Sequence, residues 1–299
     1  MSLAALVRTL LLGSILLLVF GLGLRSTVGD ADYLFRRPGL LARSLIAMYV
    51  VMPLVVIGVL LQLDLRPPVK IALVALALSP VPPFLPSKQM KLSGSKGYIY
   101  GLLIAASVLA VVWVPFVTWL FSARFGHGLR VQVPRVVGIV SLTVLLPLAA
   151  GMIVRHYLPE RSIRLSRVLS AVGTALLIVA FIPVLAAQGG ALRSLIGDGT
   201  LLAIIVFTAI GLLIGHLLGG PDPENETVLA LATASRHPAV ALAIASTIFP
   251  EQRLAPAAVL LALIVGMLAA FPYTAWRRRV HTANSKGDAG LSSTRSSSK

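Results

Sequence analysis

The sequence predicts an all-α polytopic membrane protein with nine transmembrane helices, built as an inverted four-helix repeat with two broken crossing helices. Three observations predict this class. Apolar residues make up 57% of the 299 positions and charged residues only 12%, with a mean hydropathy of +0.93. The apolar residues fall in long windows, and a short sequence string recurs in the second half of the chain. This composition excludes a water-soluble domain.

Each predicted span is an apolar window of about 20 residues, the length of helix that crosses a hydrocarbon core about 30 Å thick. The first window resembles a secretory signal, because it is short and Arg8 precedes its apolar run. No small-residue cleavage site follows it, however, and further spans do, so we expect this window to be retained as a span. The windows lie at 3–23, 40–63, 68–86, 97–122, 136–154, 167–187, 199–219, 226–249 and 254–276.

Basic residues predict the orientation. The net charge of +16 is dispersed between the apolar windows, which is typical of cytoplasmic loops and argues against a nucleic-acid partner. Lys and Arg are most frequent on the side that holds the C-terminus, so we expect the N-terminus outside and the C-terminus in the cytoplasm, in a multi-pass protein of the plasma (inner) membrane. The lipid bilayer is an expected partner, and no protein partner can be inferred.

A repeated string predicts the internal symmetry. Pro115-Phe116-Val117-Thr118-Trp119 and Pro272-Tyr273-Thr274-Ala275-Trp276 share a Pro-aromatic-x-x-Trp pattern at a displacement of 157 positions, in a chain with only three tryptophans. Within one residue, the same displacement carries Pro80 onto Pro238. It moves the chain by five spans, an odd number, so the second copy must cross the membrane in the opposite sense. Chance is the alternative for so short a match.

The repeat divides the chain into four parts. Spans one to four form the first repeat, span five is an unpaired connector, and spans six to nine form the second, inverted repeat. The Ser-, Lys- and Arg-rich end is expected to be a disordered cytoplasmic tail. The predicted parts are 1–122, 123–160, 161–276 and 277–299.

The third span contains a break. Residues 78–87 read LSPVPPFLPS, with four prolines within seven positions, and proline both lacks an N–H and clashes with the preceding helical turn. The prolines could simply end the span at the surface, but only about ten apolar residues precede Pro80. We therefore expect an unwound crossing with Ser79 and Pro80 at the break, where freed backbone groups can bind ions or substrate.

The eighth span has a matching break at Ser235, Arg236, His237 and Pro238, between two apolar stretches of roughly ten residues. An arginine at this depth costs at least about 2.5 to 3.5 kcal/mol on insertion scales, so it needs a partner. No Asp or Glu lies in the interior of a predicted span, which leaves carbonyls of span three or an anionic substrate. A purely structural clamp on those carbonyls is the alternative role. His237 precedes a proline, which favours extended backbone.

Other polar residues give weaker signals. We expect His216 at the membrane interface, Lys88, Gln89 and Lys91 in a solvated loop, and the glycines at 211, 215, 219 and 220 to permit close helix packing. Cysteine is absent, and no metal-binding, nucleotide-binding or hydrolase motif occurs. We therefore predict no catalytic residue, no metal site and no enzyme activity.

Two stretches resemble the bile acid:sodium symporter family, and together they cover about half of the chain. The first is 22–120, with Arg37-Pro38, Met52-Pro53-Leu54, Ser79-Pro80 and Lys96-Gly97. The second is 224–250, in which Glu226-Thr227-Val228-Leu229-Ala230-Leu231-Ala232-Thr233-Ala234-Ser235-Arg236-His237-Pro238 leads into Ala241-Leu242-Ala243-Ile244-Ala245. The resemblance implies a panel domain and a core domain, with the site at crossing helices three and eight of the core.

The chain departs from the sodium-coupled members of that family. Their first crossing motif reads Pro-Gly-Gly followed by Ser-Asn, whereas Pro80 is followed here by Val81-Pro82. Their second reads Glu-x-Gly-x-Gln-Asn, and the matching positions here include Ala232, Arg236 and His237. Sodium prefers oxygen ligands, so these changes argue against sodium as a bound cofactor, and no other cofactor is predicted.

The function predicted from the resemblance and the breaks is secondary transport of a small organic anion by alternating access. Arg236 would supply the positive charge that sodium provides elsewhere, and His237, whose charge changes near neutral pH, could couple proton movement. The alternatives are a sodium-coupled symporter of bile-acid-like anions and a non-transporting membrane sensor or scaffold. The predicted substrate-binding residues are Ser79, Pro80, Ser235, Arg236, His237 and Pro238.

Overall fold

A computed structural model describes residues 3–82, 85–90, 92, 95–125, 133–249 and 251–282. Every regular element in these ranges is a helix. The α-helices are α1 (Leu3–Gly23), α2 (Val28–Asp32), α3 (Pro38–Ile46), α4 (Met52–Gln62), α5 (Pro67–Leu78), α6 (Leu85–Met90), α7 (Lys96–Phe125), α8 (Val133–Val140), α9 (Leu146–Tyr157), α10 (Pro159–Leu195), α11 (Thr200–Leu218), α12 (Pro223–Ala234), α13 (Pro238–Ile248) and α14 (Ala255–Ala269). Two π-helical turns, η1 (Ala47–Val51) and η2 (Ser141–Leu145), join α3 to α4 and α8 to α9.

Within the described residues, seven continuous helices are long and apolar enough to cross a membrane. They are Ala5–Gly23, Pro38–Gln62, Lys96–Phe116, Val137–Tyr157, Pro159–Leu195, Thr200–Leu218 and Ala255–Thr282. Each coincides with one of the predicted windows. The two remaining windows, 68–86 and 226–249, are occupied by the shorter pairs α5–α6 and α12–α13. The chain is therefore an integral multi-pass membrane protein.

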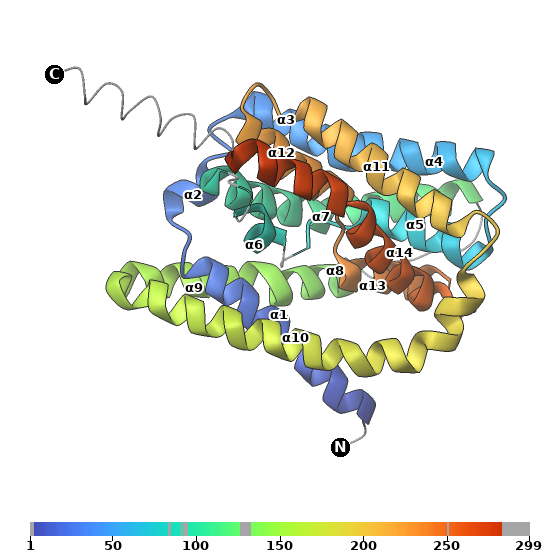
Figure 1. The fold of residues 1–299 in the computed structure, drawn as a ribbon, viewed down its shortest axis with the longest axis horizontal. Coiled ribbons are helices and arrows are strands. Elements are labelled where there is room, and N and C mark those ends of the chain that lie inside the picture. Colours follow the sequence, from blue (N-terminus) through green and yellow to red (C-terminus); the bar gives the residue numbers. More distant parts are fainter. Residues whose placement is uncertain are drawn as a thin grey trace.

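The helices form two groups. Helix α1 packs along α10 and α9 in one group, and the broken pairs pack with α3, α4, α7, α11 and α14 in the other. Figure 1 shows the first group as a layer below the second. Helices α1 and α9 touch backbone to backbone, because a Cβ on Gly23 would lie 2.9 Å from the Gly151 Cα. Such small-residue contacts are the usual way in which helices approach closely in a membrane.

A row of glycines on α11 holds α12 close, as the sequence predicts. A Cβ added to Gly215 would lie 2.4 Å from the Ala230 Cα, and one added to Gly211 would lie 2.9 Å from the Ala234 Cα. Because the backbones touch, α11 fixes the path of α12 up to the residue before its break. This contact positions the segment that carries Arg236.

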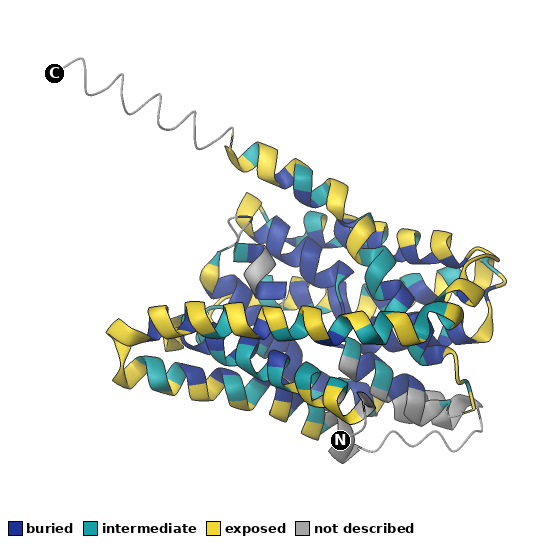
Figure 2. Cartoon of the chain, turned by 60° about the horizontal axis from the view of Figure 1, so that its bottom comes forward, coloured by how far each residue is buried: buried dark blue, intermediate teal, exposed yellow. Residues whose placement is uncertain are grey.

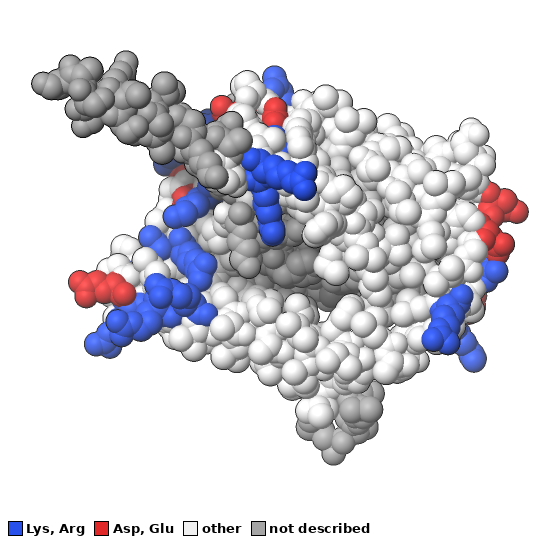
Figure 3. Space-filling view, viewed as in Figure 1, with Lys and Arg blue, Asp and Glu red and all other residues white. Residues whose placement is uncertain are grey.

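The surface between the two ends of the molecule is apolar. Exposed and partly exposed residues lie on the outer faces of the helices and buried residues lie inside (Figure 2). On the face drawn, Lys, Arg, Asp and Glu gather mostly toward the two ends of the helices, and the lower layer between the ends is free of charge (Figure 3). On the same face the surface is hollowed between the two groups. The end that holds α2, the α9–α10 turn and Arg277 is called the basic end below.

Three local features differ from the sequence expectation. Helix α2 is an additional turn, started by a capping box in which Thr27 and Asp30 bond to each other's backbone N–H. Helix α10 is longer than window 167–187, because it includes a polar first part that a hydropathy window omits. The last helix continues to Thr282, so the predicted tail begins too early, and the rest of it, 283–299, lies outside the described residues.

Candidate functional site

Both short helix pairs, α5–α6 and α12–α13, are interrupted at the same depth of the fold, and the sequence explains each interruption. Helix α5 ends where Ser79 turns to extended backbone (φ −80°, ψ 151°), and α12 ends in the same way at Ser235 (φ −108°, ψ 137°). In the first pair, Pro80 and Pro82 cannot donate to the preceding turn. In the second, His237 is extended because it precedes Pro238, which begins α13.

The two breaks meet. The backbone N–H of His237 donates to the carbonyl oxygen of Pro80 at 2.8 Å. On one side of this bond α5 packs against α13, and on the other side α6 packs against α12. The two segments therefore cross at their non-helical residues, as the sequence predicts.

Arg236 is buried at this crossing, with 2% of its surface exposed. Its Nη1 donates to the Ser79 carbonyl at 3.3 Å and its Nη2 donates to the Met48 carbonyl at 2.9 Å. Its Nε has no hydrogen-bond partner. The guanidinium thus joins three segments through carbonyl groups, which is the contact expected of a structural clamp. Its Nε–H is a buried donor that remains able to bind another group.

The Met48 carbonyl is available because of a π-helical turn. In η1 the Met52 N–H bonds to the Ala47 carbonyl, five residues earlier. In that register the Met48 carbonyl would accept from residue 53, which is proline and has no N–H. Pro53 thus releases the carbonyl that Arg236 binds. Sequence analysis missed Met48, although the Met52-Pro53 pair in the middle of a span was the signal that could have found it.

His237 is fully buried and has a defined hydrogen-bonding role. It is the N-cap of α13, and its Nδ1 accepts the Val240 N–H at 3.5 Å. With Nδ1 as acceptor, the neutral ring carries its proton on Nε2. That Nε2 has no partner, so the crossing holds a second buried donor beside Arg236.

Helices η1 and α7 supply the polar surroundings of the crossing. The Tyr49 hydroxyl donates to the Ala106 carbonyl at 2.6 Å, and the Tyr49 ring meets the Trp113 ring edge-on at 5.9 Å. Ser107 Oγ and Trp113 Nε1 on α7, and Thr233 Oγ1 on α12, are buried without a partner. Buried polar atoms are normally paired; within the described residues, unpaired ones also occur away from the crossing, at Asp32, Thr200 and Asn225.

The structure brings four of the six predicted residues into direct contact. Ser79 and Pro80 provide carbonyls to Arg236 and His237. Ser235 and Pro238 flank them, since the Ser235 N–H ends α12 on the Leu231 carbonyl and Pro238 starts α13. Among the residues described, the ion pairs place no carboxylate on Arg236.

A second polar cluster lies at the basic end. His216 lies in the last turn of α11 with its side chain 26% exposed, where the sequence expects an interfacial residue, and its Nδ1 is 3.1 Å from the Tyr273 hydroxyl and 3.7 Å from Glu226 Oε2. Arg277 contacts Glu226 at 3.4 Å and donates to the Thr227 hydroxyl at 2.7 Å. These contacts join α11 and the last helix to the beginning of α12.

Gln89 corrects the expectation of a solvated loop. It is 1% exposed, and its Nε2 donates to the Val228 carbonyl at 2.7 Å. It thereby ties α6 to α12. The side chain of Lys88 and the whole of Lys91 lie outside what the structure describes.

Comparison with known proteins identifies the family of the chain. A family model described as the Sodium Bile acid symporter family matches residues 11–195, more than half of the chain. A protein of Bacillus subtilis (strain 168), described as "Uncharacterized sodium-dependent transporter YocS", is 26% identical over 253 residues, which cover 81% of this chain and 75% of that protein. The chain thus belongs to the sodium bile acid symporter family and is a membrane transporter, not an enzyme.

Proposed function

We propose that this transporter carries a small organic anion by alternating access, with its binding site at the crossing of α5–α6 and α12–α13. The observation that carries the proposal is a buried guanidinium at the point where two broken segments meet, with unpaired donors beside it. Arg236 Nε and His237 Nε2 would bind the anion, and the freed carbonyls would hold Arg236 in position. The proposed site consists of Ser79, Pro80, Ser235, Arg236, His237 and Pro238.

The same crossing supports an inverted repeat of nine spans, in which the two broken pairs are added to the seven continuous helices. Arg236 and Ser79 are 157 positions apart, the displacement that relates the two Pro-aromatic-x-x-Trp strings. His237 and Pro80 have the same separation. Two equivalent positions of a twofold repeat touch only near its axis, so contacts between them are expected if the axis runs through the crossing.

The orientation in the membrane follows from the basic end. Figure 3 shows its concentration of Lys and Arg, and such residues are retained in the cytoplasm during insertion. We therefore assign the basic end to the cytoplasm and the N-terminus to the outside of the plasma (inner) membrane. In that orientation α12 runs from the cytoplasmic side to the crossing, and α13 runs from the crossing to the outer side.

We propose that transport does not require sodium. A sodium ion at the crossing would need several oxygen ligands, and the Ser79 and Met48 carbonyls already accept from Arg236. A fixed guanidinium also supplies the charge that a bound cation would bring to an anion. No sodium or other cofactor therefore forms part of the proposed site.

Sodium-coupled symport is the second candidate, because the matching family is described as one of sodium symporters and the Bacillus protein as sodium-dependent. The two candidates differ in one measurable property. Uptake into proteoliposomes driven by an anion gradient should be unchanged when sodium is replaced by choline if the first is right. Loss of uptake in choline would favour the second.

The substrate can be sought by thermal stabilisation. The purified protein would be heated with a panel of carboxylates that includes a bile acid, in sodium and in choline. Ligands that stabilise the protein would then be tested for uptake with Arg236→Gln and with Arg253→Gln, whose side chain is exposed. We expect uptake to fail only in Arg236→Gln. Uptake that persists in a normally inserted Arg236→Gln protein would contradict the proposal.

A further inference from the structure

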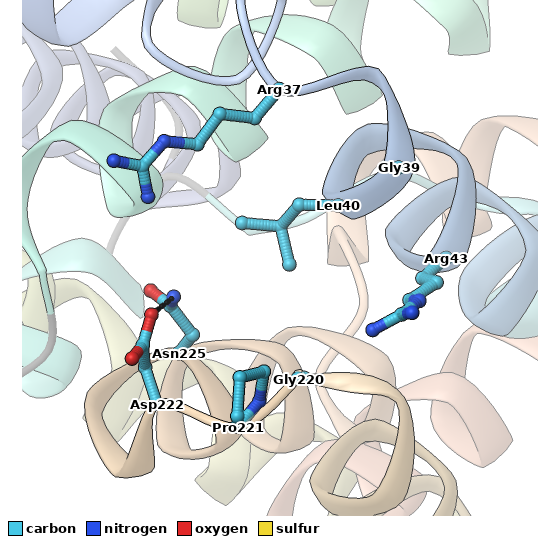
Figure 4. A pocket seen from close by; sticks show the side chains of 9 residues that line it. Arg37, Gly39, Leu40, Arg43, Gly220, Pro221, Asp222 and Asn225 are labelled. Carbon is cyan, nitrogen blue, oxygen red and sulfur yellow. Dashed lines mark hydrogen bonds between the residues drawn. The ribbon is translucent and has the colours of Figure 1, made fainter.

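A separate cavity lies at the basic end, away from the crossing. It has a volume of about 230 Å³ and lies between the start of α3 and the loop that joins α11 to α12. Figure 4 shows Arg37 and Arg43 reaching it from opposite ends of one wall, with Leu40 between the two arginines, and Asp222 and Asn225 on the facing loop below Arg37. Because a water molecule occupies about 30 Å³ in the liquid, the cavity has room for a small polar group of several heavy atoms.

One wall of the cavity is cationic. Arg37 precedes α3, and its guanidinium lies 4.2 Å from the centre of the Tyr33 ring and donates to the Tyr33 hydroxyl. Arg43 reaches the loop on the far side, where a Cβ on Gly220 would be 3.9 Å from Arg43 Nη1. Over the described part of the chain, neither arginine has a carboxylate within ion-pair distance. Two arginines without counter-charges are suited to an anion, and to phosphate in particular.

The opposite wall offers acceptors. Asn225 is 4% exposed, and its Nδ2 donates to Asp222 Oδ2 at 3.0 Å. Its Oδ1 is buried without a partner. The carboxylate of Asp222 and this amide oxygen would repel a bare anion but would bind an ammonium or hydroxyl group that is attached to one. The cavity therefore pairs a phosphate-binding wall with a donor-binding wall.

We infer that the cavity binds a phosphate group that carries a hydrogen-bond donor on a short arm, as in the headgroups of phosphatidylethanolamine and phosphatidylglycerol. The phosphate would lie between Arg37 and Arg43, and the amine or hydroxyl would reach Asp222 and Asn225. The cavity is at the charged end of the helices, where lipid headgroups lie and where basic pockets between helices bind them. A soluble phosphate ester with the same two groups is the other source of this chemistry.

An occupant would connect two parts of the transporter. Helix α3 leads through η1 to Met48, and α12 leads to Arg236. A headgroup held between the starts of these helices would contact two of the three segments that Arg236 joins, the one that carries Met48 and the one that carries Arg236 itself. The inference does not depend on which ion or anion binds at the crossing, because the cavity and the proposed transport site share no residue.

The test uses the full chain, purified and stripped of lipid, in native mass spectrometry with phosphatidylethanolamine, phosphatidylglycerol and phosphatidylcholine at equal concentration. Phosphatidylcholine is the probe that lacks the donor. We expect the first two lipids to be retained in preference to the third, and their binding to weaken roughly tenfold in Arg43→Ala, the loss expected for one charge-assisted contact. Because Arg43 has no ion-pair partner, its replacement should leave the fold intact.

The matched control is Arg36→Ala, which removes the same charge at the same end. Arg36 is paired with Asp32 and its side chain is 76% exposed, and it does not line the cavity. The Arg36→Ala protein should bind these lipids as the unmodified protein does. O-phosphoethanolamine and glycerol 1-phosphate are tested in parallel by thermal stabilisation. If these esters stabilise the protein in an Arg43-dependent way and the lipids are not retained, the site is supported and its ligand is soluble.

Two results would overturn the inference. One is equal retention of all three lipids, or equal loss of binding in Arg36→Ala and Arg43→Ala, since either would indicate a diffuse surface charge effect. The other is failure of every lipid and both phosphate esters to bind. Neither result bears on the crossing, whose own tests use Arg236.

Discussion

The backbone N–H of His237 donates to the Pro80 carbonyl at 2.8 Å, so the two broken segments of this transporter are joined at the residues that interrupt them. Each break releases backbone groups that a continuous helix would satisfy internally. Arg236, the residue before His237, binds the Ser79 carbonyl released at the first break and the Met48 carbonyl freed in η1. The proposed binding site is therefore built mostly from main-chain atoms, with one fixed positive charge.

Arg236→Gln should lower thermal stability as well as anion binding. Removal of the guanidinium leaves the Ser79 and Met48 carbonyls unsatisfied in a buried place, which costs about 1–3 kcal/mol for each such group. A melting curve of the purified protein without ligand measures this effect. Arg253→Gln, on an exposed loop, should melt like the unmodified protein. Equal melting temperatures for both variants would show that Arg236 does not hold the crossing together.

Pro53→Ala should weaken anion binding, although Pro53 is not one of the proposed binding residues. Alanine restores an N–H that can bond to the Met48 carbonyl and so competes with Arg236 for it. We expect a smaller anion-induced rise in melting temperature. Pro147→Ala is the matched control, because Pro147 follows the other π-helical turn, η2, in the same way. A response of Pro147→Ala as large as that of Pro53→Ala would count against the role of the Met48 carbonyl.

Gly215→Ala should displace α12. The added Cβ would lie 2.4 Å from the Ala230 Cα, and this backbone atom cannot move without its helix. Overpacking of this kind typically costs about 1–3 kcal/mol, measured as a lower midpoint of thermal unfolding. Gly58→Ala on α4 is the control, since a Cβ there meets nothing within 4 Å. Gly58→Ala should be neutral or slightly stabilising, because alanine favours helix more than glycine.

Arg277→Met should separate the last helix from α12. Arg277 is 9% exposed and contacts Glu226, Thr227 and the Pro223 carbonyl. Removal of these charge-assisted bonds should reduce the free energy of unfolding by about 2–3 kcal/mol. Arg278→Met removes a neighbouring charge that is exposed and should change little. If the two variants unfold alike, the Arg277 contacts do not stabilise the fold.

Much of this architecture is readable from the sequence because the bilayer imposes simple rules. The apolar windows coincide with helices, and prolines mark both breaks, a cluster at the first and the single Pro238 at the second. The alternative that Arg236 binds carbonyls of span three follows from the lack of acidic residues in the spans, and the Ser79 contact agrees with it. Hydropathy and proline spacing are local properties of the chain, so the helices and breaks that depend on them can be predicted from one sequence.

The rest depends on geometry that those rules do not contain. The Met48 carbonyl becomes available only because η1 adopts the π register, in which Pro53 falls at the position that would have donated to it. Arg43 lies inside the predicted window 40–63, where a side chain facing lipid or protein is expected, yet its side chain is exposed and lines the cavity beside α12. Gln89 follows a proline cluster and is polar, but α12 covers it.

The central claim is that the positive charge of Arg236 binds the transported anion in place of a sodium ion. The most direct measurement is the affinity of a stabilising anion for the purified protein, in sodium and in choline, with and without Arg236→Gln. We expect equal affinity in the two salts for the unmodified protein and a loss of binding in the variant. Binding that requires sodium, and that Arg236→Gln retains, would contradict the account.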